Sequence, residues 1–151
     1  EITHCHPEGI AGSIAIAVGA AVAWRFRDAE KPTRQEFIKA ILPYIPESFV
    51  RDACEKARDL PKGTSVKEAV VALGNGSAVA AQDTVPFVLW CAGENLDDYE
   101  TAFWQTASGG GDVDTTCAMV GGIVALYVGD KHLPERWKMQ REPLPIWAFE
   151  E

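Results

Sequence analysis

The segment at residues 109–116 carries the side chains best suited to chemistry in this 151-residue sequence. It reads Gly-Gly-Gly-Asp-Val-Asp-Thr-Thr, so flexible glycines lead into the carboxylates of Asp112 and Asp114 and the hydroxyl of Thr115. Hard oxygen atoms of this kind suit Mg²⁺, Mn²⁺ or Ca²⁺ rather than zinc or copper. The same residues are also typical of an ordinary helix start, at which Asp114 or Thr115 would bond the first free amides. The pattern alone leaves a metal site and a helix cap as alternatives.

A second candidate lies at residues 3–8, just ahead of a long apolar stretch. His4 and His6 are separated there by one residue. They could act together as ligands, or they could form a histidine-rich helix cap. His132 is the only other histidine in the sequence, so a three-histidine zinc site is not expected.

The third candidate is the glycine-rich segment of Gly74, Asn75, Gly76 and Ser77. Such a segment between two helices most often serves as a helix C-cap and a turn. It could also let backbone amides approach a ligand, because glycine has no side chain in the way.

Helical patterns surround these three segments, and no stretch alternates convincingly with a period of two residues. Thr33 with Glu36 and Ser65 with Glu68 form capping boxes. Pro86 is expected in the first turn of a later helix, where proline is tolerated. We therefore predict a single all-α domain, with helices near residues 9–24, 33–42, 47–58, 65–73, 83–91, 97–108 and 114–128, and an irregular, proline-containing tail at residues 131–151.

Two of the expected helices carry rows of small side chains that would let another backbone approach closely. The rows are Ala11, Ala15, Gly19 and Ala23, and Cys117, Gly121, Ala125 and Gly129. The apolar stretch at residues 9–24 is interpreted as a buried helix, because it follows acidic and histidine residues and is too short to span a membrane.

Composition narrows the class of protein further. The apolar fraction of 47% and the charged fraction of 24% exclude a disordered chain, a collagen-like fibre and a membrane bundle. The formal net charge of −8 makes nucleic-acid binding unexpected. The cysteines Cys5, Cys54, Cys91 and Cys117 occur singly, which favours reduced thiols and hence a cytoplasmic location.

Taken in order along the chain, these motifs resemble the ADP-ribosylglycohydrolase family. The resemblance rests on residues 3–8, on Val-Pro-Phe at residues 85–87, and above all on Gly-Gly-Asp-Val-Asp-Thr at residues 110–115. Met-Val-Gly-Gly at residues 119–122 and Tyr-Val-Gly at residues 127–129 extend it. It covers nearly the whole chain but only about the C-terminal half of a family member.

The resemblance implies a compact all-α fold that binds two Mg²⁺ or Mn²⁺ ions and cleaves ADP-ribose from an acceptor. Acceptors in the family include arginine or serine side chains of proteins and other ADP-ribose compounds. By this resemblance Asp112, Asp114 and Thr115 would be metal ligands, and His4 would lie near the ADP-ribose. Gly74, Asn75, Gly76 and Ser77 would lie near its adenosine end.

The family's other metal ligands and its water-activating acid belong to an N-terminal Gly-Asp-Asp-Thr-like segment that this sequence does not contain. We therefore expect a magnesium-dependent ADP-ribosyl hydrolase in the parent protein and little or no turnover by this chain alone. We also expect pairing with the missing half or self-association, because apolar faces such as the Ala11 to Ala23 row would be exposed. The alternative is a non-catalytic ADP-ribose-binding or structural module on the same fold.

Overall fold

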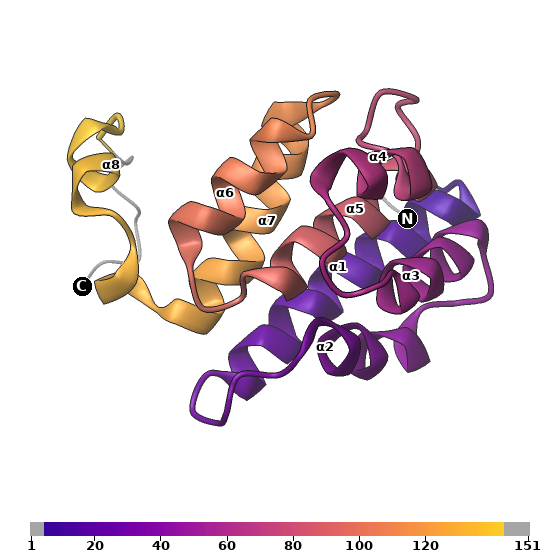
Figure 1. Ribbon diagram of the computed structural model, residues 1–151, viewed down its shortest axis with the longest axis horizontal. Coiled ribbons are helices and arrows are strands. Elements are labelled where there is room, and N and C mark those ends of the chain that lie inside the picture. Colours follow the sequence, from indigo (N-terminus) through magenta and orange to yellow (C-terminus); the bar gives the residue numbers. More distant parts are fainter. Residues whose placement is uncertain (1–4, 144–151) are drawn as a thin grey trace.

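The computed structural model describes residues 5–143, which form α-helices and short 3₁₀-helices and contain no β-strand (Figure 1). The all-α prediction is confirmed. In chain order the elements are α1 (Pro7–Phe26), α2 (Arg34–Ile41), η1 (Leu42–Tyr44), α3 (Phe49–Asp59), α4 (Val66–Leu73), α5 (Ala81–Glu94), α6 (Tyr99–Ser108), α7 (Val113–Val128), η2 (Asp130–His132) and α8 (Glu135–Gln140).

Helix α5 is the centre of the domain. Every residue at positions 84–93 is buried, which is typical of a helix surrounded by protein on all sides. It packs against helices α1, α2, α3, α4, α6 and α7. The rings of Phe87 and Trp90 stack inside this core with their centroids 6.2 Å apart. The start of α5, which lines the groove of the candidate site, therefore belongs to a helix that packs against six others.

The start of α5 differs from the expectation. The helix begins at Ala81, so Pro86 lies inside it and the expectation of a first-turn proline is wrong. The N-cap residue Ala80 makes no side-chain cap, which is why the sequence gives no local signal for this boundary. Because proline has no N–H, the Gln82 carbonyl lacks its usual helical donor.

Helix α1 uses its row of small residues for packing, as predicted. Ala11, Ala15, Gly19 and Ala23 are all buried, and a Cβ atom on Gly19 would lie 3.1 Å from Leu89 Cδ2 of α5. The expectation that this row would be exposed in the isolated chain is wrong, because helices α2, α5 and α7 of the same chain pack against α1.

Helix α1 is also longer than the apolar stretch expected from the sequence. With 20 residues it is, among the residues described, the one helix long and apolar enough to cross a bilayer, so the argument that the stretch is too short is wrong. Its contacts with α2, α5 and α7 are those of a core helix in a helical domain. Only 33% of its most apolar window is buried, however, so much of this helix faces outward.

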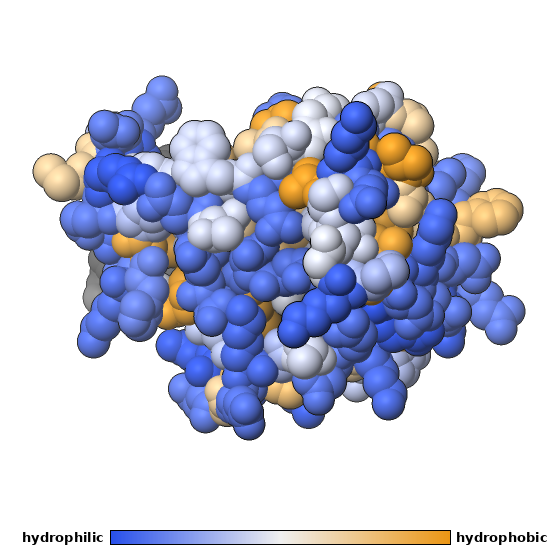
Figure 2. Space-filling model, in the orientation of Figure 1, coloured by the Kyte–Doolittle hydropathy of each residue, from blue (hydrophilic) through white to orange (hydrophobic). Residues whose placement is uncertain are grey.

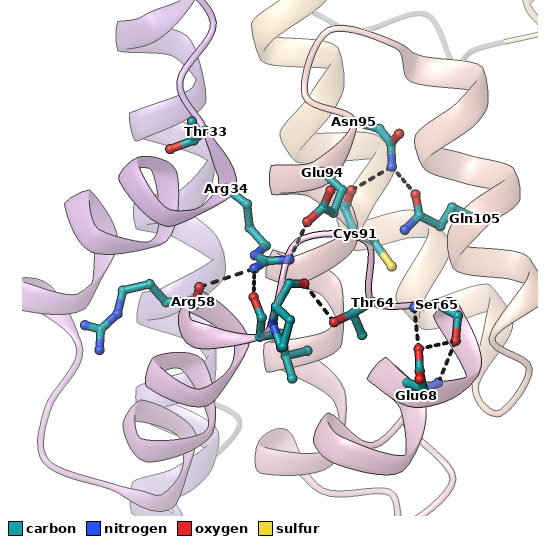
Figure 3. A network of polar contacts seen from close by, with 12 residues as sticks. Thr33, Arg34, Arg58, Thr64, Ser65, Glu68, Cys91, Glu94, Asn95 and Gln105 are labelled. Carbon is teal, nitrogen blue, oxygen red and sulfur yellow. Dashed lines mark hydrogen bonds and ion pairs between the residues drawn. The ribbon is translucent and has the colours of Figure 1, made fainter.

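An Arg34-centred network joins α2, α5 and the end of α3 (Figure 3). The Arg34 side chain is 2% exposed and pairs with the Glu94 carboxylate. Its guanidinium also donates to the backbone carbonyls of Leu60 and Arg58, the latter at 3.4 Å. A Cβ on Gly93 would lie 2.9 Å from Arg34 Cγ, so the stem of this arginine needs a glycine on α5.

The helix starts predicted from capping boxes are confirmed. The Thr33 and Ser65 hydroxyls accept the N–H groups of Glu36 and Glu68, whose carboxylates bond back to the cap residues. Helix α3 has an additional cap from another helix. The Glu8 carboxylate on α1 accepts the Phe49 N–H at 3.1 Å and the Val50 N–H at 2.9 Å.

The tail is more regular than expected over the part that the structure describes. It contains η2 and α8, and the α8 ribbon lies at the left edge of Figure 1, beside α6. Aromatic packing explains why this part of the tail is regular. The Trp137 ring of α8 lies edge-on to the rings of Tyr99, Phe103 and Trp104 of α6, at centroid distances of 5.0 to 6.0 Å. The face of the molecule seen in Figure 2 is mostly hydrophilic.

Candidate functional site

Asp112 stands at the start of α7 with its carboxylate free of any capping role. It occupies the N-cap position, yet its side chain makes no capping hydrogen bond. The N-cap residue is therefore Asp112 rather than Asp114 or Thr115. The Asp114 carboxyl does lie against the first N–H groups of the helix, so the metal site and the helix start both remain open for this segment. The preceding Gly110 and Gly111 have φ values of 63° and 72°, a backbone conformation that favours glycine.

The glycine-rich loop after α4 holds the Asp112 segment in place. The Asp112 N–H donates to the Asn75 carbonyl at 3.1 Å, and the Asn75 side-chain amide donates to the Gly109 carbonyl at 2.9 Å. The backbones touch: a Cβ on Gly76 would lie 2.7 Å from Asp112 Cβ, and one on Gly111 would lie 2.4 Å from the Asn75 carbonyl oxygen. Two motifs far apart in the sequence therefore form one structural unit.

Asp83, in the first turn of α5, holds the same loop in place through two hydrogen bonds. Its carbonyl accepts the Gly76 N–H at 3.1 Å, and its carboxylate accepts the Ala78 N–H at 2.8 Å. Gly74 ends α4 as its C-cap with a φ of 87°, as the sequence predicted for a turn. The loop at residues 74–80 is thus fixed both to α5 and to the start of α7.

A groove of about 910 Å³ opens beside this unit. Its walls come from three places: the first half of α1, the segment that leads into α5, and the start of α7. The lining residues are His6, Glu8, Gly9, Gly12, Ser13, Ile16, Ala17, Val79, Ala80, Ala81, Gln82, Thr84, Val85, Asp112, Thr115 and Met119. The close approach of α1 and α5 depends on small residues, since a Cβ on Gly12 would lie 2.9 Å from Ala81 Cβ.

The structure brings together most, but not all, of the residues singled out in the sequence. Asp112 and Thr115 line the groove, whereas Asp114 is exposed next to them. The loop of Gly74, Asn75, Gly76 and Ser77 supports Asp112, and its continuation at residues 79–82 lines the groove instead. His4 lies outside the described residues.

His6 is a helix cap whose ring also borders the groove. Its Nδ1 accepts the Glu8 N–H at 3.2 Å at the start of α1. This agrees with the cap interpretation of the two histidines for His6. Sequence reasoning missed Ile16 and Met119 as groove residues, because in one sequence an apolar side chain beside a site has the same pattern as one in the core.

The carboxyl groups of Asp112 and Asp114 interact with each other at the start of α7. The neighbouring Asp112 carboxyl, followed by the backbone N–H groups of Asp114 and Thr115, holds the pKa of the Asp114 carboxyl below its usual range. A hydrogen bond between two carboxyl groups needs a proton on one of them. With both ionised they would repel each other, and a cation between them would remove the repulsion. Their oxygens and the Thr115 hydroxyl form a donor set that fits Mg²⁺ or Mn²⁺.

The set is nevertheless incomplete. Among the described residues there is no group of three or more histidine, cysteine or acidic side chains that could hold a metal ion. Mg²⁺ is commonly bound through one or two carboxylates, with the remaining positions taken by water and substrate. The described residues thus present two carboxyl groups and one hydroxyl at the start of α7, and no complete set of metal ligands.

The comparison with protein families identifies the class. The model for ADP-ribosylglycohydrolase matches residues 1–148, so the chain belongs to the ADP-ribosylglycohydrolase family. The resemblance seen in the motifs is confirmed, and the all-α architecture agrees with it.

Curated relatives include the ADP-ribosylhydrolase ARH3 of Bos taurus, 26% identical over an alignment of 172 positions that covers 94% of this chain and 46% of the relative. The ARH3 of Homo sapiens is 24% identical over the same shares of the two chains. An uncharacterized protein of Archaeoglobus fulgidus is 28% identical, over 90% of this chain and 42% of its own length. The chain thus spans less than half the length of these relatives. No solved structure matches it.

Proposed function

We propose that this chain forms one side of a metal-dependent site that hydrolyses the bond between ADP-ribose and an acceptor, such as a protein side chain. The observation that carries the proposal is the placement of Asp112 and Thr115 in the wall of a groove large enough for a nucleotide-sized ligand. The family match and the ARH3 relatives support ADP-ribose chemistry.

In this proposal Asp112, Asp114 and Thr115 hold Mg²⁺ or Mn²⁺ from the α7 side. The bound ion would offset the charge of the ligand's diphosphate and polarise a water molecule. The acidic groups themselves stabilise positive charge, such as that which develops on a ribose ring when its glycosidic bond breaks. The Asn75 carbonyl, through its bond to the Asp112 N–H, keeps the carboxylate directed from a fixed backbone.

The remaining ligands would come from a second polypeptide segment, so we propose that the isolated chain has little or no turnover. Support comes from the outer faces of α1 and α7, which pack side by side and carry exposed small or apolar residues. On α1 these are Ala17, Ala21 and Trp24, and on α7 Ala118, Gly122 and Leu126. We propose that the missing half of the enzyme covers this surface, or a second copy of the chain does so in its absence. The free thiols support a cytoplasmic location.

A non-catalytic ADP-ribose-binding module is the second candidate. It is favoured by the incomplete donor set of the described residues. The two candidates differ in turnover and share the requirement that the groove binds ADP-ribose.

A calorimetric titration tests the proposal: Mg²⁺ first, then ADP-ribose in the presence and absence of Mg²⁺. We expect ADP-ribose binding that needs the metal and is lost in Asp112→Asn. Asp28→Asn removes an exposed carboxylate outside the groove and serves as the matched control. Binding that is unchanged in Asp112→Asn would refute the metal assignment. Release of ADP-ribose from an ADP-ribosylated peptide by the purified chain would refute its inactivity.

A further inference from the structure

A second hollow lies next to the groove and shares one of its walls. It has a volume of about 520 Å³ and lies where the start of α3 meets the start of α1. Glu8 lines both this hollow and the groove, so the two adjoin at that residue. A ligand that fills the groove and extends past Glu8 therefore reaches the surface at the start of α3.

Unpartnered apolar side chains surround this hollow. Phe49, the first residue of α3, is 70% exposed and lines the hollow. Tyr44, at the end of η1, is 57% exposed, and the neighbouring Pro43 and Pro46 are exposed as well. We call these four residues the α3 corner. Exposed apolar side chains with a polar rim are typical of a surface that contacts a partner.

The polar rim of the α3 corner is mostly negative. Four carboxylates and one guanidinium line the hollow beside Phe49, from Glu8, Glu47, Asp52, Glu55 and Arg51. The Arg51 Nε lies 3.5 Å from the Glu55 carboxylate, so these two charges offset each other. Glu47 and Asp52 are exposed, and neither forms an ion pair with another residue that the structure describes. The surface therefore complements a partner that carries positive charge.

Helix α3 does not need these two free carboxylates as caps. The first three N–H groups of the helix already have acceptors, from the Glu8 carboxylate and the Ser48 hydroxyl. Glu47 and Asp52 thus remain available beside the exposed ring of Phe49. A ring next to carboxylates fits a side chain with an apolar stem and a cationic end, which is the form of lysine and arginine.

We propose that the α3 corner binds the protein part of the substrate, a basic segment next to the ADP-ribosylated side chain. This inference rests on the proposed ADP-ribose function. ADP-ribose carries negative charge on its two phosphates, so the acidic hollow repels the nucleotide and attracts a segment rich in lysine or arginine. The stem of a basic side chain packs on Phe49, while its charged end faces Glu47 and Asp52.

Two peptides that carry ADP-ribose on the same serine separate the corner from the groove. One has lysines on both sides of the serine, and the other has glutamines in their place. Both peptides, and ADP-ribose alone, are titrated by calorimetry in the presence of Mg²⁺. The first variant combines Glu47→Gln with Asp52→Asn, and the second is Phe49→Ala. The control for net charge combines Asp28→Asn with Glu30→Gln, two exposed carboxylates between α1 and α2.

We expect the unaltered chain to bind the lysine peptide roughly 3- to 10-fold more tightly than the glutamine peptide at low salt, and the preference to fall as the salt concentration rises. The variant without the two carboxylates should lose most of this preference, and Phe49→Ala should lose part of it. The control should keep it. ADP-ribose alone should bind equally to all four chains, because none of the altered residues lines the groove.

Each contrary outcome overturns a different statement. If ADP-ribose binds but the unaltered chain does not distinguish the two peptides, the α3 corner does not bind the acceptor and the proposed function stands. The same holds if the variant without Glu47 and Asp52 keeps the preference. If the control loses the preference to the same extent, overall charge explains it and the corner is again wrong. If ADP-ribose does not bind, the proposed function fails for this chain and the acceptor assignment fails with it.

Discussion

The backbone N–H of Asp112 donates to the carbonyl oxygen of Asn75 at 3.1 Å. This bond joins the loop after α4 to Asp112, the N-cap residue of α7. It thereby places beside the groove a carboxylate that makes no capping bond. The relationship explains why both loops are rich in glycine: Gly76 lies against Asp112, and Gly111 lies against Asn75. Placement of the candidate metal ligand is thus a property of two loops acting together.

Alanine substitutions in the triple glycine test this relationship. Gly111→Ala would place Cβ 2.4 Å from the Asn75 carbonyl oxygen, so the loops must separate. We expect a loss of about 2–4 kcal/mol in unfolding free energy, from backbone strain and overpacking together, and weakened Mg²⁺ binding. Chemical denaturation and calorimetry measure the two effects.

Gly110→Ala is the matched control. Gly110 also has a positive φ, of 63°, but a Cβ there meets nothing within 4 Å. Gly110→Ala should lower the unfolding free energy only through backbone strain, by about 1 kcal/mol, and should leave Mg²⁺ binding unchanged. Equal losses for the two variants would mean that contact between the loops contributes nothing.

The Glu8 carboxylate ties the start of α1 to the start of α3. Glu8→Ala should lower the unfolding free energy by about 1–2 kcal/mol, because the N–H groups of Phe49 and Val50 lose their acceptor at a helix N-terminus. Glu47→Ala, which removes an exposed carboxylate next to α3, should change it by less than about 0.5 kcal/mol. A Glu8→Ala variant as stable as the control would show that water replaces the cap without loss.

Arg34 is the buried charge on which three helices converge. Arg34→Lys keeps the charge but loses the planar group that reaches Glu94 and the Leu60 carbonyl together, so we expect a loss of about 2–4 kcal/mol. Arg58→Lys changes a largely surface ion pair with Asp59 and should cost less than about 0.5 kcal/mol. Urea unfolding curves of the two variants give the comparison, and similar midpoints would contradict a special role for Arg34.

The sequence predicted the features that depend on residues within one helical turn, and it missed the features that depend on tertiary contacts. The Thr33–Glu36 and Ser65–Glu68 capping boxes were correct because both partners lie within one helical turn. The predicted start of α5 was wrong, and the packing of α8 through Trp137 was not predicted, because tertiary neighbours decide both. For the site, the motif pointed to Asp112, Asp114 and Thr115, and of these Asp112 and Thr115 line the groove. The support from Asn75 could not be predicted, because it requires two distant loops to meet. Val79, in the loop after α4, has a φ of +53°, and nothing in a single sequence indicates this conformation.

Burial protects two of the cysteine thiols chemically as well as sterically. It raises the pKa of Cys54 to about 12 and that of Cys91 to about 12, so neither forms thiolate near neutral pH. Cys5 is exposed. At pH 8 iodoacetamide should therefore label Cys5 rapidly in the native chain, and label Cys54 and Cys91 only after denaturation. Mass spectrometry of the labelled peptides reads this out, and fast native labelling of Cys54 would contradict the packing of α3 on α5.

The two capping boxes predict how stability changes with pH. In the folded chain the Thr33 backbone N–H and hydroxyl lower the pKa of Glu36 below 4.5, and the Ser65 hydroxyl and N–H do the same for Glu68. A carboxyl group that is more acidic when folded stabilises the fold while it is ionised. This contribution is fully present above the unfolded pKa, and it is lost as pH falls through the folded one. Glu36→Gln should therefore be less stable than the unaltered chain at pH 7, and the gap should narrow as the pH falls below 4.5 and close once Glu36 is protonated in the folded chain. Thermal unfolding across this range measures the gap, with Glu30→Gln, an exposed carboxylate ahead of the same helix, as the control. A gap for Glu36→Gln that stayed constant with pH would assign the stabilisation to side-chain shape rather than to charge.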